Sequence, residues 1–311
     1  LARFQGKDAP VQRTLFEVFR EHNDKCIQLS GTDMAPATVQ RYETSLKHTR
    51  DFVWETYHKK DVLLDEVSRQ FIEDYEFWLK TEKKCCHNTA TKYLKNFKKI
   101  IRIALAKGWM KNDPFLEIRF SLDKVEPDFL EDSEIQKLIS KEIDIPRLSQ
   151  VRDIFVFCCF TGLAFSDIHG LRKEHIVEDS NGVRWIRKGR QKTKIMCNIP
   201  LIEIPLKILE KYSTNEYCKK YGVLFPVLCN QKMNAYLKEL ADICGIKKTL
   251  TTHVGRHTFA TFALANGVSI ESVAKMLGHT NVQMTRHYAR VLDRTVIREM
   301  SQIKMDLHFS M

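Results

Sequence analysis

The feature that most constrains the fold is a polar, proline-containing stretch about a third of the way along the chain. Residues 111–130, KNDPFLEIRFSLDKVEPDFL, contain Pro114 and Pro127 and charges of both signs. Proline removes a backbone donor and disfavours helix in the residue before it. The chain has 311 residues, too many for one compact core. The sequence therefore predicts two domains, residues 1–110 and 128–311, joined by a linker over residues 111–127.

Apolar residues recur at helical spacing before this linker. The segments with this spacing are residues 13–29, 35–57, 68–84 and 88–108. The last of them has cap-forming residues at Asn88 and Thr89 and stops at Gly108. We predict a small helical domain.

The segment from residue 88 to residue 107 contains lysines and arginine but no acidic residue. One interpretation is a solvated helix face. The other is a helix that follows a phosphate backbone, because Lys and Arg displace the counterions that DNA condenses. The formal charge of +11 agrees with a polyanionic partner. The candidate DNA contacts are Lys92, Lys95, Lys99 and Arg102.

The second domain is also mainly helical by pattern. Helical spacing extends over residues 131–140, 147–163, 230–245, 252–267, 269–279, 280–291 and 294–307. Residues 183–201, VRWIRKGRQKTKIMCNIPL, place strand-like flanks around the polar turn KGRQKT and predict a β-hairpin. The predicted class is mostly α, with a helical first domain and an α+β second domain.

The stretch THVGRHTFAT places His253 and Arg256 three residues apart, in the first turn of a helix that Thr251 or Thr252 can cap. Free backbone N–H groups and a forked guanidinium at such a helix start favour a bound anion. A capped helix with exposed polar residues is the alternative. A metal held by His253 and His257 is disfavoured, since no carboxylate ligand follows and a cation lies between them.

The turn RKGRQKTK is strongly basic, and it suits either a solvated surface or a DNA groove. Lys192 on this turn is a candidate general acid. Lys188 and Lys194 are candidate DNA contacts.

His279 and Tyr288 lie nine residues apart in LGHTNVQMTRHYARV. On one unbroken helix they would point to opposite faces. Gly278 can end one helix, and Thr280 or Asn281 can cap the next, so a turn brings His279 back toward Tyr288. The alternative is a surface helix whose tyrosine only packs its ring.

The order of these motifs resembles that of the tyrosine recombinases, or phage-type integrases, over nearly the whole chain. The matching stretches are TGLAFSDIHGL, the hairpin lysine, HVGRHTFAT and LGHTNVQMTRHYARV. The resemblance implies a core-site DNA-binding domain, a catalytic domain with the tyrosine recombinase fold, and no cofactor or metal. It implies double-stranded recombination sites as partners, a homotetramer on two sites, and accessory DNA-bending proteins as further candidates. The family's frequent N-terminal arm-binding domain has no counterpart here, and the sequence leaves open whether it was removed.

The resemblance also implies roles for individual residues. Tyr288 matches the nucleophile, which forms a 3′-phosphotyrosyl link and frees a 5′-hydroxyl. Lys192 matches the lysine that protonates the leaving oxygen, and Asp167 matches a supporting acid. Stabilisation of the non-bridging oxygens falls to Arg256, His253 and His279.

One position departs from the family pattern. The family's first catalytic arginine follows TGL, where this chain has Ala164. Integrases of some conjugative transposons share this loss, and this chain resembles that branch. Arg190 is our candidate substitute because alternate residues of an extended segment face one side, which would place it beside Lys192; Arg187 and Arg172 are reserves. A catalytically impaired DNA-binding regulator is the alternative function that Ala164 favours.

The remaining predictions concern partners and location. The segment of about residues 293–307 has an apolar face that either packs on its own domain or, as the resemblance implies, docks on a neighbouring protomer. No apolar run reaches the ~20 residues of a membrane span, and no secretory signal is present. The 9 cysteines form no Cys-x-x-Cys pair, as expected for reduced thiols. We expect a bacterial cytoplasmic protein that associates with the nucleoid when it acts. Inversion or resolution enzymes and type IB topoisomerases share the chemistry and stay open.

Overall fold

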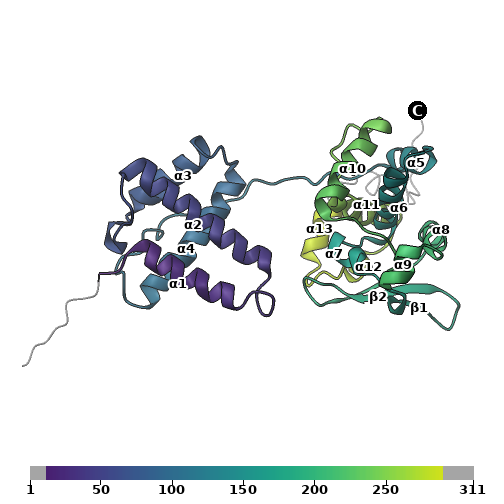
Figure 1. Cartoon of the computed structure of the whole chain (residues 1–311), viewed down its shortest axis with the longest axis horizontal. Coiled ribbons are helices and arrows are strands. Elements are labelled where there is room, and N and C mark those ends of the chain that lie inside the picture. Colours follow the sequence, from purple (N-terminus) through teal and green to yellow (C-terminus); the bar gives the residue numbers. More distant parts are fainter. Residues whose placement is uncertain (1–11, 290–311) are drawn as a thin grey trace, which may run out of the picture. The chain divides into compact units, whose positions relative to one another are not determined.

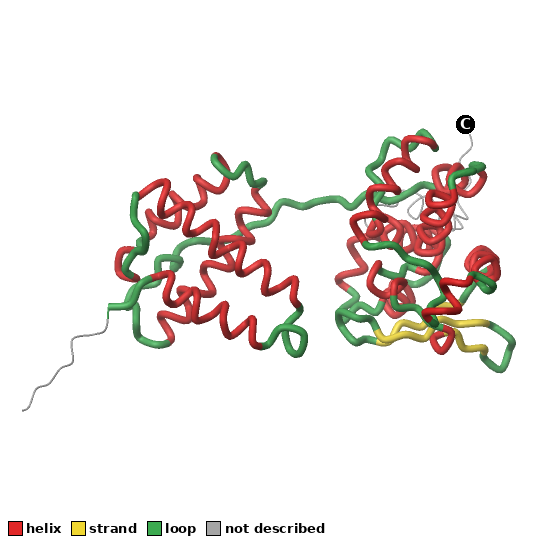
Figure 2. Tube along the Cα trace, in the orientation of Figure 1, coloured by secondary structure: helices red, strands yellow, loops and turns green. Residues whose placement is uncertain are grey.

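A computed structural model describes residues 12–289 of the chain. The chain divides into two compact units, residues 1–125 and 126–311, each with its own core (Figure 1). The secondary structure of the described residues is mainly helical, with strands only in the second unit (Figure 2). The predicted fold class is confirmed. Among the described residues, none of the helices has the length and apolar character that crossing a membrane requires.

The first unit is built from helices around an aromatic core. Its elements are α1 (Leu15–Gln28), α2 (Pro36–Tyr57), the short 3₁₀ helix η1 (Leu64–Glu66), α3 (Arg69–Thr81) and α4 (His87–Ala106). A capping box at Thr14 starts α1, and the Ser68 hydroxyl accepts the Phe71 N–H at the start of α3. The ring of Phe52 packs against those of Phe71 and Tyr75 in the interior.

Helix α4 separates apolar and basic residues onto two faces. Leu94, Phe97 and Ile101 are buried in the core of the first unit. The cap is Cys86, not Asn88 or Thr89 as predicted. The Asn88 amide instead exchanges two hydrogen bonds with the backbone of Asp123. Asn88 therefore ties α4 to the chain segment that follows the helices.

Part of the segment predicted as a linker packs on the first unit. Phe115 is fully buried there, and its ring contacts those of Phe97 and Phe120. Burying a phenylalanine stabilises this position by about 1.5–3 kcal/mol relative to exposure. The described chain from residue 119 to residue 131 has no regular secondary structure.

The second unit combines helices with one small antiparallel sheet. Its elements are α5 (Asp132–Ser140), α6 (Pro146–Thr161), α7 (Phe165–His169), the 3₁₀ helix η2 (Lys173–His175), β1 (Ile176–Glu178), β2 (Arg184–Gly189), β3 (Met196–Pro200), α8 (Glu203–Tyr212), α9 (Glu216–Tyr221), α10 (Asn230–Ile243), α11 (Thr252–Ala265), α12 (Ile270–Leu277) and α13 (Gln283–Ala289). The strand order is β1-β2-β3, and the predicted hairpin corresponds to β2 and β3, with Ile186 opposite Ile199.

Two buried helices form the centre of the second unit. Helix α6 is buried on nearly all sides, which explains its continuous apolar run, and α11 packs along it. Gly255 on α11 permits this approach, because a Cβ there would lie 3.2 Å from the Phe155 ring and 3.3 Å from Cys158 Cβ. Gly162 ends α6 with φ of +67°.

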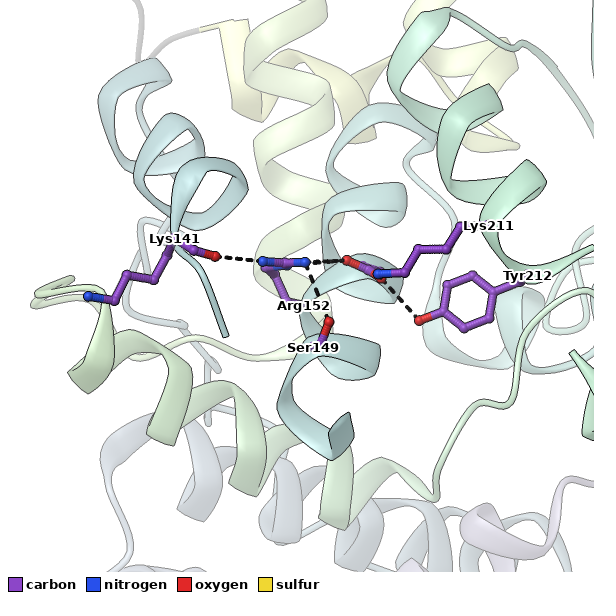
Figure 3. A network of polar contacts seen from close by, with 6 residues as sticks. Lys141, Ser149, Arg152, Lys211 and Tyr212 are labelled. Carbon is purple, nitrogen blue, oxygen red and sulfur yellow. Dashed lines mark hydrogen bonds and ion pairs between the residues drawn. The ribbon is translucent and has the colours of Figure 1, made fainter. Parts of the chain in front are cut away.

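A polar network fastens α6 to α8. Asp153 accepts hydrogen bonds from Arg152, from Lys211 Nζ at 2.6 Å and from Tyr212 Oη at 3.1 Å. Arg152 also donates to the Lys141 carbonyl, so the network reaches the end of α5 (Figure 3). Asp153 is nearly buried, and this set of donors is what compensates for removing its charge from water.

The structure contains elements that the sequence patterns did not indicate. These are the first strand of the sheet, the short helices α7, α8 and α9, and the 3₁₀ helices η1 and η2. The segment of about residues 293–307, predicted as an exchange helix, lies outside the described residues.

Candidate active site

Helix α11 supplies the central cation of the site. Arg256 is 3% exposed, and its guanidinium donates to the carbonyls of Gly162 at 2.7 Å and Leu277 at 2.6 Å. These carbonyls end α6 and α12, so one side chain joins three helices. Burial, and then the nearby charge of Arg190, lowers the pKa of Arg256 to about 10, so it stays protonated at neutral pH.

The first turn of α11 differs from the prediction in one detail. Thr251 is the N-cap residue, but its side chain makes no capping bond. The side chain of Asn234 on α10 accepts the Thr252 N–H instead. His253 is exposed in this turn, and its ring lies edge-on against that of His257, with centroids 4.4 Å apart. The Thr252 N–H is therefore not free to bind an anion, and the first turn presents the ring of His253 at the surface.

The predicted break after α12 is present. Gly278 takes φ of +60° and ends the helix, and the Asn281 side chain accepts the Gln283 N–H at the start of α13. His279 thereby faces α11, where its Nε2 lies 3.0 Å from Arg256 Nη2. Arginine has no acceptor, so Nε2 carries a lone pair, and Nδ1–H donates to Thr285 Oγ1 at 2.9 Å.

Tyr288 on α13 lies against His257, the residue that follows Arg256 on α11. Its side chain is 7% exposed and packs with Phe259, Leu264 and Leu277. Its hydroxyl lies 2.9 Å from His257 Nδ1. Arg256 and His257 are neighbours on α11, so one helix holds His279 with the first side chain and Tyr288 with the second. Helices α11, α12 and α13 pack together around these contacts (Figure 1).

The hairpin turn brings a second arginine to the same place. Arg190 Nε lies 3.6 Å from Asp167 Oδ2, and Arg190 Nη1 lies 3.5 Å from the Gly278 carbonyl. Asp167 Oδ1 accepts the Gln191 N–H at 2.8 Å, which fixes the turn. Within residues 12–289, buried Arg190 Nε has no hydrogen-bond partner. The contacts of this guanidinium with other described residues are therefore long, at 3.5 and 3.6 Å.

The prediction that Arg190 and Lys192 face one side of an extended segment is wrong. Residues 190–194 do not extend β2; they form a turn in which Arg190 N–H donates to Ile195 and Lys194 N–H donates to Arg190. Arg190 points into the unit with an 11% exposed side chain, while Lys192 is exposed at the tip. In a tight turn, residues two apart do not point to the same side as they do in an extended strand, so Arg190 and Lys192 point in different directions.

The other predicted positions fall into different settings. Lys188 Nζ donates to the Gly170 carbonyl at 2.9 Å, so its ammonium already has a partner inside the unit. Lys194 is exposed on the turn, with φ of +59°. Ala164 is half-buried and caps α7, two residues after the carbonyl that Arg256 contacts.

Burial lowers the pKa of the histidines of the site, which favours their neutral forms. Burial, followed by the nearby charge of Arg256, lowers the pKa of His279 to about 4. Burial, followed by His253, Arg256 and His287, lowers the pKa of His257 to about 4. Burial also raises the pKa of Tyr288, and the arginines oppose this effect. In the part of the chain that the structure describes, no cluster of three or more His, Cys, Asp or Glu side chains is placed to hold a metal ion.

The basic face of α4 is exposed as predicted. The exposed side chains are Lys92, Lys95, Lys99 and Arg102. Three of these, together with Lys98, line a surface hollow whose remaining wall is Phe120. Lys99 also lies over the Tyr42 ring and donates to its hydroxyl at 3.0 Å. This hollow combines several cations with an aromatic floor and contains no acidic residue.

The site holds a buried tyrosine beside a histidine, on a helix that also carries a buried arginine. Residues 14–122 match the phage integrase SAM-like domain, and residues 128–295 match the phage integrase family. The chain belongs to the phage integrase family. It is a tyrosine site-specific recombinase, an enzyme that breaks and rejoins DNA strands.

Individual relatives agree with this assignment. A tyrosine recombinase of Pseudothermotoga lettingae is 30% identical over 267 residues, which cover 83% of this chain and 88% of the relative. Tyrosine recombinase XerD of Shewanella oneidensis is 24% identical over 285 residues, covering 88% of this chain and 92% of the relative.

Solved structures show the same fold. A lambda integrase dimer bound to a core site has a TM-score of 0.71 at 18% identity, over 89% of this chain and 95% of that one. The Tn1549 transposon integrase in complex with a circular intermediate DNA also has a TM-score of 0.71, at 16% identity over 93% and 99% of the two chains.

The structure adds partners that sequence reasoning missed. Arg256 sets the tautomer of His279, Thr285 then accepts the Nδ1–H of that ring, and the carbonyls of Gly162 and Leu277 fix Arg256. His257 was considered only as a metal ligand, yet it is the partner of the Tyr288 hydroxyl. Its place directly after Arg256 on a helix that faces Tyr288 was the available signal.

Proposed function

We propose that Tyr288 attacks a scissile phosphodiester at a recombination site of a mobile element and forms a 3′-phosphotyrosyl intermediate. The observation that carries this role is the position of the Tyr288 hydroxyl beside the ring of His257. His257 directly follows the buried Arg256 on α11. Joining the 3′ end to tyrosine conserves the bond free energy, so a different strand can be joined without ATP.

Arg256 and Arg190 bind the phosphate in this proposal. Two guanidinium groups in one partly dry site favour a bound dianionic transition state, because charge interactions strengthen when water is excluded. Arg190 supplies the charge that Ala164 does not, and its long contacts leave donors for phosphate oxygens. Asp167 positions the turn that carries it.

The remaining roles belong to groups at the edge of the site. Lys192, exposed at the tip of the turn, protonates the leaving 5′-oxygen, and exposed His253 donates to a non-bridging oxygen. His279 Nε2 accepts from Arg256 in the described state. With a phosphate present, we assign His279 to the phosphate oxygens as well.

The proposed partner is double-stranded DNA that carries two recombination sites, bound by four copies of the chain. A lambda integrase tetramer bound to a Holliday junction has the same fold at a TM-score of 0.71, which supports this assembly. The basic face of α4 and Lys194 on the hairpin turn contact the DNA backbone. Lys188 serves as a structural residue unless DNA displaces its Gly170 contact. We place the enzyme in the bacterial cytoplasm, on the nucleoid during the reaction, with accessory DNA-bending proteins as additional partners.

Covalent trapping tests the proposal. Nicked duplexes from the ends of the mobile element that encodes the chain would be mixed with wild type, Tyr288→Phe and Arg190→Ala, then resolved on denaturing gels. We expect a covalent band with wild type, no band with Tyr288→Phe, and a band at least about 100-fold slower to form with Arg190→Ala. Wild-type rates for Arg190→Ala would remove that residue from the mechanism. A band that persists with Tyr288→Phe would overturn the nucleophile.

A further inference from the structure

The phenol of Tyr288 has one hydrogen-bond partner among residues 12–289, the Nδ1 atom of His257 at 2.9 Å. The two rings are tilted by 45° with centroids 5.3 Å apart, so His257 approaches the hydroxyl edge-first. His257 is half-buried, and Tyr288 is buried. The oxygen that must lose a proton therefore already touches an imidazole nitrogen.

The other groups around the site are less suited to accept that proton. Both nitrogens of His279 are engaged, Nε2 with Arg256 and Nδ1 with Thr285. Arg256 itself is a donor only. His253 contacts the ring of His257 and has no described contact with the hydroxyl of Tyr288. Of these histidine and arginine side chains, only His257 has a described contact with the Tyr288 hydroxyl; His253, Arg256 and His279 are the residues that the family pattern assigns to the phosphate.

We propose that His257 is the general base of the strand-cleavage step, a role that rests on Tyr288 being the nucleophile. As Tyr288 Oη forms its bond to phosphorus, the phenol proton passes to His257 Nδ1. The bond from phosphorus to the 5′-oxygen breaks, and that oxygen takes a proton from Lys192. In rejoining, the 5′-hydroxyl passes its proton back to Lys192 as its oxygen bonds to phosphorus. The bond from phosphorus to Tyr288 Oη then breaks, and His257 returns its proton to the departing phenolate.

The electrostatic setting agrees with this role. His257 is neutral before DNA binds, because burial and the charges facing it keep its pKa near 4. Those charges belong to His253 and Arg256 on its own helix and to His287 on α13, and the phenol of Tyr288 also faces its ring. A neutral imidazole is an acceptor. An entering phosphate brings negative charge to the same site and raises the basicity of His257 at the point where the proton must move.

The test compares variants at position 257 in single-turnover cleavage of the nicked duplexes. His257→Gln and His257→Asn keep a polar side chain but cannot take a proton. We expect each to form the covalent product about 100-fold more slowly than wild type. Imidazole added to His257→Ala restores part of the rate. His287→Gln is the matched control, because His287 is exposed, adjoins Tyr288 and makes no described hydrogen bond to it. It cleaves at close to the wild-type rate.

A second substrate separates a base from other roles. A duplex with sulfur in place of the bridging 5′-oxygen has a leaving group that needs no proton. It restores cleavage by Lys192→Ala, while the defect of His257→Gln persists. Restoration of His257→Gln by sulfur would move His257 to the leaving-group side and overturn the proposal. Cleavage at the wild-type rate or faster by both His257→Gln and His257→Asn would overturn the proposal, because the contact between His257 and Tyr288 would then have no part in the reaction. Loss of the wild-type adduct, or an adduct with Tyr288→Phe, would refute the proposed function itself, independently of His257.

Discussion

Gly278 ends α12 and lies against the side chain of Arg190. A methyl group at this position should therefore destabilise the fold and also displace Arg190. Its φ is +60°, and a Cβ would lie 2.7 Å from Arg190 Cδ and 2.7 Å from Cys197 Sγ. The left-handed backbone costs an L-residue about 1–2 kcal/mol, and overpacking adds about 1–3 kcal/mol. We expect Gly278→Ala to lower the free energy of unfolding by about 2–5 kcal/mol.

Gly245→Ala is the matched control for this substitution. Gly245 has φ of +63°, and an added Cβ would have no non-neighbouring atom of the described residues within 4 Å. It therefore measures the backbone cost alone, about 1–2 kcal/mol. Thermal unfolding gives both values, at roughly 2–4 °C per kcal/mol for a unit of this size. Covalent-product formation reports the displacement of Arg190. Equal unfolding temperatures for the two variants, or full cleavage by Gly278→Ala, would refute the packing argument.

Three further predictions concern stability, pH and DNA affinity. Asp153→Asn weakens the network between α6 and α8 and should cost about 1–3 kcal/mol in urea unfolding while the folded protein keeps its cleavage rate; an unchanged midpoint contradicts this. The folded pKa values of His257 and His279 lie near 4, below the ordinary 6.5, so the unfolded chain binds more protons between these values. Stability should therefore fall as pH drops from 7 to 5, and less steeply in the His257→Gln/His279→Gln double variant; parallel curves would exclude these groups. Lys99→Ala and Arg102→Ala should each reduce the slope of log affinity against log salt by about 1 in fluorescence anisotropy; unchanged slopes would place DNA elsewhere.

The sequence predicted the features that depend on local pattern. Helical spacing marked α1, α2, α3 and α4, and strand-like flanks around a polar turn marked β2 and β3. Gly278 was expected to end a helix because glycine tolerates the left-handed backbone, and it does so. The short helices α7 and α9, of 5 and 6 residues, span fewer than two turns and cannot establish a repeat; the sequence patterns also missed α8, which has 10 residues.

The site depended on contacts that no local pattern contains. Arg256 donates to Gly162 across 94 positions, and Arg190 reaches Gly278 across 88. The motif spacing placed Arg256 and Tyr288 in one region but gave no ring orientation. The sequence therefore named no partner for the Tyr288 hydroxyl, and the structure places the ring of His257, the residue after Arg256, beside it.

The central claim is that Tyr288 carries the DNA during the reaction. Wild-type protein trapped on the nicked duplex would be digested with protease and nuclease, and the nucleotide-bearing peptide sequenced by mass spectrometry. We predict a single modified residue, Tyr288, with its oxygen linked to a 3′-phosphate and the complementary product ending in a free 5′-hydroxyl. An adduct on another residue, a 5′-phosphate linkage, or cleavage with no protein adduct would contradict the account.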